Sequence, residues 1–146
     1  MTPPPAKPLP PGVTVRKVGP IDVWEKQTPH YSLSQVKTVV GQYGASVFGG
    51  KAIQGFTAMG LQMQHAVAAI LQLEPRHFFK SMTSEDDPNH KTWQDVYHGP
   101  TPNGLAYIKF MIFYPPAQSS TALAPTPKLV ISFKNCLLYT SLSGLA

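Results

Sequence analysis

Cysteine is almost absent from this chain of 146 residues, which contains a single one, Cys136. One thiol cannot form an internal disulfide framework, and it cannot build a cysteine-based zinc cluster. The sequence therefore gives no signal of an oxidising compartment.

Long apolar runs are absent as well. No stretch approaches the ~20 apolar residues that a transmembrane helix needs, and no charged-then-apolar signal peptide opens the chain. We therefore expect a cytoplasmic protein with no membrane association. The length suits one domain with one modest core.

Acidic residues are few, because 12 Lys and Arg stand against 7 Asp and Glu, for a net charge of +5. This excess favours a polyanionic partner such as nucleic acid or an acidic protein. Charge alone leaves open the alternative of a basic protein without such a partner.

Several active-site motifs are missing too. The sequence has no phosphate-binding glycine loop, no His-Glu-x-x-His zinc site and no Gly-x-Ser-x-Gly nucleophile elbow. The acidic run Glu85-Asp86-Asp87 leads into Pro88-Asn89, a pattern more typical of a solvated turn than of a magnesium site. We expect any catalysis to need no metal and no other cofactor.

Proline, in contrast, is concentrated at the N-terminus, where residues 1–20 hold seven of the 16. Proline lacks a backbone donor and favours an extended, polyproline-like chain. We predict a disordered arm over residues 1–23 that adds nothing to an active site, with a ligand for a proline-recognition domain as the alternative. The folded domain is expected over 24–135.

Helical patterns come first within that domain. Ser32 and Gln35 resemble a capping box, and the helix that follows should end at Gly41 or Gly44. Further helices are expected over 51–58 and 63–71, although Gly55 weakens the first of these.

Short extended runs separated by turn residues follow, and we expect strands over 80–84, 92–98, 105–114 and 128–134. Helices followed by antiparallel strands indicate an α+β domain, with the helices packed on one face of a small sheet.

Side-chain alternation predicts which residues lie on the other face. Successive side chains of a strand point to opposite faces, so Tyr107 and Lys109 should lie opposite the apolar set Ala106, Ile108, Phe110 and Ile112. In the last strand the apolar set is Leu129, Ile131 and Phe133, opposite Val130, Ser132 and Lys134. We therefore expect Tyr107 and Lys134 on an uncovered, polar face.

Six short blocks of sequence occur in a recognisable order: Thr28-Pro29-His30, Leu33-Ser34-Gln35-Val36-Lys37, Phe78-Phe79-Lys80-Ser81-Met82-Thr83, Trp93-Gln94-Asp95-Val96-Tyr97, Tyr107-Ile108-Lys109 and Leu129-Val130-Ile131-Ser132-Phe133-Lys134. Over about residues 24–135 the chain resembles the MqsR family of bacterial toxins. The resemblance implies a RelE-like toxin fold, cleavage of messenger RNA, and a cognate antitoxin protein as partner.

The same resemblance implies the catalytic residues, which are Lys80, Gln94, Tyr107 and Lys134. The two lysines would supply positive charge to the scissile phosphate, Gln94 would orient a phosphate or a base edge, and Tyr107 would exchange a proton or stack on a base. Taken one by one, these residues would more often be surface or packing residues. Their joint placement favours catalysis.

Three further residues are expected to contact RNA: Lys109, His98 and His30. Lysine and tyrosine titrate near ~10 and are poor bases at neutral pH, whereas histidine is better matched, so His98 and His30 are the candidate bases. Position 98 is often arginine in the family, and its histidine predicts RNA binding that strengthens as the pH falls.

The last residues differ in character. Cys136-Leu137-Leu138-Tyr139-Thr140-Ser141 resembles a translated sequencing adapter, so we interpret 136–146 as a read-through tail with no evolved role.

The expected activity is metal-independent and ribosome-independent cleavage of single-stranded messenger RNA at a short motif. A catalytically silent RNA- or DNA-binding regulator on the same scaffold is the main alternative, and a ribosome-dependent nuclease is a weaker one.

Overall fold

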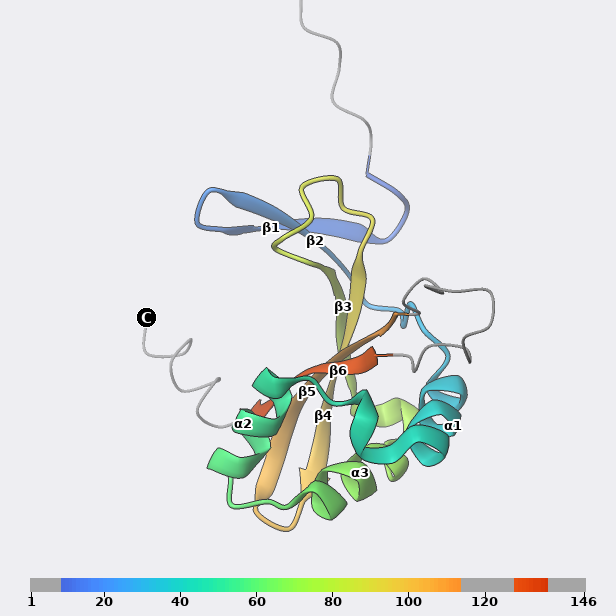
Figure 1. Ribbon diagram of the computed structural model, residues 1–146. Coiled ribbons are helices and arrows are strands. Elements are labelled where there is room, and N and C mark those ends of the chain that lie inside the picture. The colour runs from blue at the N-terminus through green and yellow to red at the C-terminus, as the bar shows by residue number, and fades with distance from the viewer. Residues whose placement is uncertain (1–8, 114–127, 137–146) are drawn as a thin grey trace, which may run out of the picture.

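The computed structural model describes residues 9–113 and 128–136. Figure 1 shows three α-helices gathered against one part of a sheet, with a hairpin projecting beyond them. The elements in chain order are β1 (Val13–Val18), β2 (Ile21–Lys26), α1 (Leu33–Tyr43), the short 3-10 helix η1 (Gly44–Val47), α2 (Gly50–Ala58), α3 (Met63–Leu71), η2 (Pro75–His77), β3 (Phe78–Thr83), β4 (Trp93–Thr101), β5 (Gly104–Phe113) and β6 (Lys128–Asn135).

The six strands form one sheet in the order β1-β2-β3-β4-β5-β6, and each neighbouring pair is antiparallel. The helices lie between β2 and β3 in the chain and cover one face of the sheet at β4–β6 (Figure 1). The predicted α+β class, with helices on one sheet face, is confirmed. In the described part of the chain no helix has the length and apolar character needed to cross a membrane.

Each predicted helix is present with nearly the predicted ends. Ser32 caps α1, because its hydroxyl oxygen accepts a hydrogen bond from the backbone N–H of Gln35 at 3.3 Å. The helix continues through Gly41 and ends at Gly44, whose φ of 56° is accessible to glycine at little cost.

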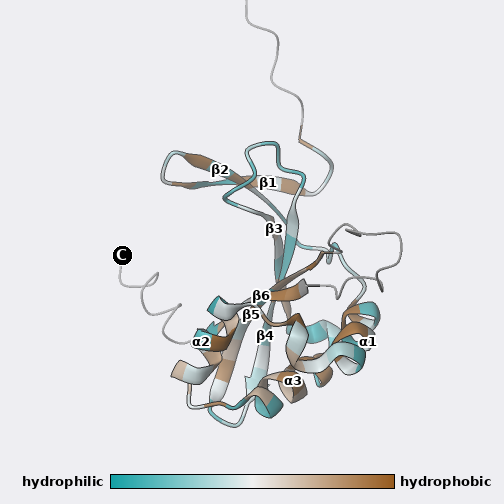
Figure 2. Cartoon of the chain, in the orientation of Figure 1, coloured by the Kyte–Doolittle hydropathy of each residue, from teal (hydrophilic) through white to brown (hydrophobic). Residues whose placement is uncertain are grey.

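The main core lies between the helices and the sheet. Val36 and Val40 from α1 and Ile70 from α3 are fully buried in one cluster with Ile108 and Phe110 of β5. Figure 2 shows the corresponding apolar colouring on the inner sides of the helices, while the loop between β3 and β4 is hydrophilic.

The N-terminal hairpin corrects the expectation of a disordered arm over 1–23. Strands β1 and β2 pair from Val13↔Lys26 to Val18↔Ile21, and Glu25 and Lys26 pair with β3. The high proline count obscured the segment Val13–Val18, which contains no proline and has the β-branched residues that favour strands. Of the predicted arm, residues 1–8 lie outside the described part.

A second, smaller core corrects the expectation of an uncovered face. Val23, Met82, Val96, Tyr107 and Cys136 pack together on the sheet face opposite the helices. Tyr107 is therefore only 3% exposed. Cys136 belongs to this core, while the rest of the predicted tail, 137–146, lies outside the described residues.

Val130 also departs from the predicted alternation, since it is buried in the helix-side core. The register between β5 and β6 shifts after Lys109, which pairs with Ser132, so that the next residue, Phe110, pairs with Val130. Such a bulge places an extra residue on one strand, so the side chains next to it no longer follow the regular alternation, and Leu129 and Val130 are both buried in the helix-side core.

Helix α2 packs on the edge strand β6 through a glycine. A Cβ atom added at Gly55 would overlap the backbone carbonyl oxygen of Phe133. Gly55, which weakens α2 as an isolated helix, is therefore needed for the close contact that holds α2 against β6.

Gly55→Ala should accordingly destabilise the fold by about 3 kcal/mol, because the overlapping partner is backbone and cannot rotate away. Gly41→Ala is the matched control, since a Cβ there meets nothing within 4 Å inside α1, and it should stabilise the protein by about 0.5 kcal/mol. Urea unfolding of both variants measures the difference. Equal stabilities would contradict the assigned contact between α2 and β6.

Candidate active site

The structure brings six of the seven predicted site residues to one face of the sheet. His98, Tyr107 and Lys134 are direct cross-strand neighbours on β4, β5 and β6. Lys80 and Lys109 lie in the adjacent row, on either side of Val96. Neighbouring side chains on one face approach closely enough to act together. Gln94 lies one step further along β4 on the same face.

Lys80 owes its orientation to a register shift at Phe79, which lies between the paired residues Phe78 and Lys80. The Lys80 ammonium donates to the Oε2 atom of Glu25 on β2 at 2.6 Å, and the two side chains are only 7% and 15% exposed. Arg16 of β1 lies 3.6 Å from the same oxygen. Lys80 is therefore a buried, partnered cation.

His98 lies between two aromatic rings. It stacks on Phe79 with ring centroids 4.4 Å apart, and Tyr107 lies 6.2 Å away on its other neighbouring strand. Burial, and next the positive charge of Lys80, lower the pKa of His98 below its ordinary value of 6.5. The ring is thus neutral at pH 7 and can accept a proton.

Tyr107 and Lys134 form a second pair. The Lys134 ammonium lies 4.9 Å from the centroid of the Tyr107 ring, within range of a cation–π interaction. Lys134 itself is exposed, while the ring beneath it is buried. The phenol therefore lies directly below a positive charge that is open to solvent.

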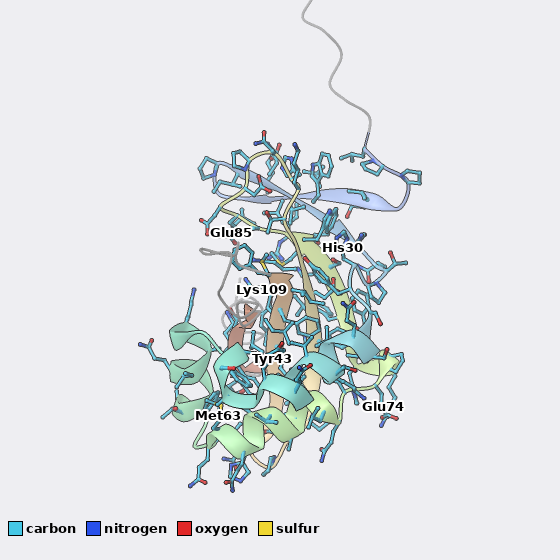
Figure 3. The ribbon with its side chains drawn as sticks, turned by 45° about the vertical axis from the view of Figure 1, so that its right-hand side comes forward. His30, Tyr43, Met63, Glu74, Glu85 and Lys109 are labelled. Carbon is cyan, nitrogen blue, oxygen red and sulfur yellow. The ribbon has the colours of Figure 1, made fainter. Side chains whose placement is uncertain are left out.

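A polar cleft of about 370 Å³ opens beside these residues. Burial, and next the charge of Lys134, lower the pKa of Lys109, while Glu85 raises it. Figure 3 shows Glu85 and Lys109 near one another on one side of the sheet. The residues that line the cleft are Lys51, Ser84, Glu85, Asp86, Gln94, Lys109, Ser132 and Lys134.

Lys51 is a site residue that the sequence did not reveal. It lies in the first turn of α2, and it reaches the cleft because α2 packs along β6. In the sequence it is one more lysine at a helix start, and nothing in the chain predicts which strand that helix contacts. Within the described residues neither Lys51 nor Lys109 forms an ion pair.

The acidic run has two roles. Asp87 makes the expected turn, because its carboxylate accepts hydrogen bonds from the backbone N–H groups of Lys91 and Thr92. Glu85 and Asp86, however, line the cleft. Over residues 9–113 and 128–136, no three His, Cys, Asp or Glu side chains gather closely enough to hold a metal ion.

His30 is the one predicted site residue that lies elsewhere. Its backbone N–H donates to the buried carboxylate of Asp95, and its ring stacks on Trp93 at 5.7 Å. Asp95 and Trp93 alternate with Gln94 along β4, so His30 lies on the helix side of the sheet. Figure 3 agrees, with His30 on the other side from Lys109.

Comparison with known proteins shows the family to which the chain belongs. Residues 28–135 match the family described as motility quorum-sensing regulator, toxin of MqsA. The chain belongs to this family. It is also 36% identical over 92 residues to the mRNA interferase toxin MqsR of Escherichia coli (strain K12), an alignment that covers 62% of this chain and 89% of that protein.

The family match contains every residue that lines the cleft, including Lys51, Lys109 and Lys134. It begins after β2, so the β1–β2 hairpin with Arg16 and Glu25 lies outside it. Glu25, the counterion of Lys80, therefore lies three residues before the first matched residue.

The environment of His98 predicts its titration. We expect its ring to titrate below pH 6.5, as measured by NMR of the imidazole protons, because burial and Lys80 both disfavour the charged form. Lys80→Gln should move the midpoint upward without restoring 6.5, since burial is the larger cause. A midpoint at or above 6.5 in the unaltered protein would contradict the described packing.

Proposed function

We propose that this chain is the toxin of a type II toxin–antitoxin pair and cleaves single-stranded messenger RNA endonucleolytically, at a short motif, without ribosomes or metal ions. The observation that supports this most strongly is the convergence of Lys51, Lys109 and Lys134 with Gln94 on one polar cleft. Three cations around one cleft suit the phosphates of a polyanion.

The chemistry requires three groups: an acceptor for the 2′-hydroxyl proton, cations for the phosphate, and a donor for the leaving oxygen. In this proposal neutral His98 takes the proton from the 2′-hydroxyl, whose oxygen attacks phosphorus. The bond from phosphorus to the 5′-oxygen breaks, and that oxygen receives a proton from Tyr107. The products are a 2′,3′-cyclic phosphate and a 5′-hydroxyl.

The lysines have different roles in this proposal. Lys109 and Lys134 contact the RNA phosphates in the cleft, where Gln94 orients a phosphate or base edge. Lys80 stabilises the negative charge that builds on the scissile phosphate. Because Tyr107 and Lys80 are 3% and 5% exposed, the reacting nucleotide must displace residues that pack on them.

That burial is also the observation that favours a second candidate, a catalytically silent RNA- or DNA-binding regulator. Such a protein would use the cleft and leave Tyr107 and Lys80 covered. For either function the family description, toxin of MqsA, supports an antitoxin protein as partner. Action on messenger RNA would place the protein in the cytoplasm.

A cleavage assay on a long RNA in excess chelator separates the two candidates. The unaltered protein should cut at discrete sites. Tyr107→Phe removes only the hydroxyl and should lower the rate about 100-fold, and Lys80→Gln, which keeps an N–H donor for Glu25, should lower it similarly. Mapping of the RNA ends reports the motif.

The matched control is Lys17→Gln, which removes an 80% exposed lysine of the hairpin and should cleave at the unaltered rate. Cleavage at the unaltered rate by both site variants would reject the assigned residues. RNA binding without any cleavage by the unaltered protein would establish the regulator instead.

RNA affinity should also depend steeply on salt, because the cleft lysines displace counterions from phosphates. In a Tyr107→Phe background, in which cleavage is about 100-fold slower, each of Lys109→Gln, Lys134→Gln and Lys51→Gln should reduce the slope of log affinity against log salt by about 0.7. Fluorescence anisotropy with a short single-stranded RNA measures it. An unchanged slope in all three would place the RNA path elsewhere.

A further inference from the structure

The counterion of Lys80 comes from outside the family match. Glu25 belongs to β2, whereas the match begins at residue 28. Its carboxylate and the Lys80 ammonium are 2.6 Å apart, the shortest ion pair among the described residues. A charge-assisted hydrogen bond of this length is among the stronger polar contacts that a protein makes.

Burial makes this carboxylate necessary for Lys80. The Lys80 side chain is 7% exposed, so its ammonium has lost most of its hydration, and leaving it there without a partner would be costly. Glu25 supplies the missing interaction. Arg16 of β1, 3.6 Å from the same Oε2 atom, holds that oxygen in turn.

Sheet geometry shows what the pair does to Lys80. Glu25 is directly opposite Met82, two residues beyond Lys80 on β3. The Lys80 side chain therefore leans toward β2 and away from Val96, its partner on β4. Glu25 sets where the ammonium lies relative to His98, the nearest titratable group on β4.

We propose that Glu25 is a positioning residue of the RNA-cleaving site, which holds the Lys80 ammonium in place, and that the β1–β2 hairpin is thereby a functional part of this toxin. The inference rests on the proposed function, since it assigns a role within that same site. Glu25 acts through Lys80 and makes no contact with RNA.

The test is steady-state cleavage by the full chain on a short RNA that contains the mapped site. Glu25→Gln should lower kcat about 10- to 100-fold, the effect of losing one charge-assisted hydrogen bond. KM should change less than about twofold, because the cleft lysines that capture RNA are untouched. Glu25→Asp, which keeps the carboxylate, should lose less than Glu25→Gln.

The control within the same strand is Asp22→Asn. Asp22 pairs with Lys17 at 3.3 Å, and both side chains are largely exposed, so its loss should leave kcat and KM unchanged. Thermal unfolding of all variants is measured in parallel. If Glu25→Gln does not fold, the kcat and KM of Glu25→Asp are compared with those of the unaltered protein instead.

A double-mutant cycle separates action through Lys80 from any other effect. In a Lys80→Gln background, Glu25→Gln should change kcat by less than about twofold, because the group it positions is already gone. Fully additive losses would overturn the inference, and so would an unchanged or higher kcat in Glu25→Gln alone. No cleavage by the unaltered chain would instead overturn the proposed function, and this inference with it.

Discussion

The hydrogen bonds of the buried Asp95 carboxylate determine which side chains of β4 face the helices and which face the cleft. The carboxylate is fully buried, and it accepts hydrogen bonds from the backbone N–H groups of His30 and Tyr31 at 3.0 and 2.9 Å. These bonds anchor the loop between β2 and α1 to the central strand β4. With Asp95 directed to the helix side, its neighbours Gln94 and Val96 must face the cleft side. One buried side chain thus connects the loop after the hairpin to β4 and fixes the orientation of that strand, and leaving it without hydrogen bonds would be costly.

The positive charges of the site are held in two physically different ways. Lys80 is buried and compensated by Glu25, so its charge is local and little affected by dissolved ions. Lys51 and Lys109 line the cleft and form no ion pair with another described residue, and the pKa of Lys109 is lowered by burial and next by the charge of Lys134. Lysines that repel one another do not stabilise the fold. Glu85 and Asp86, which line the same cleft, offset part of this repulsion, and the polyanion that we propose as ligand would relieve the rest.

Strand alternation alone predicts that Tyr107, Lys109 and Lys134 share one face, because the period of two survives wherever pairing is regular. The prediction from alternation was wrong at Val130, because a bulge that no local residue signals places this side chain on the helix side of the sheet. The hairpin was missed because proline-rich flanks dominated the composition around Val13–Val18. Lys51 and Glu25 were missed for a different reason. Their roles depend on which distant strand their own element contacts, and side-chain periodicity carries no such information.

The two kinds of lysine also indicate how capture and chemistry are separated in this fold. In the proposed function, capture uses the exposed Lys51 and Lys134 and the half-buried Lys109, on elements that lie within the family match. Positioning of Lys80 uses β2, which is joined to β3 by only two residue pairs, at Glu25 and Lys26. A short pairing opens at a lower free energy than the long ladder between β4 and β5. The hairpin is therefore the part of the sheet whose detachment would release Lys80 from its carboxylate while leaving the lysine-lined cleft assembled.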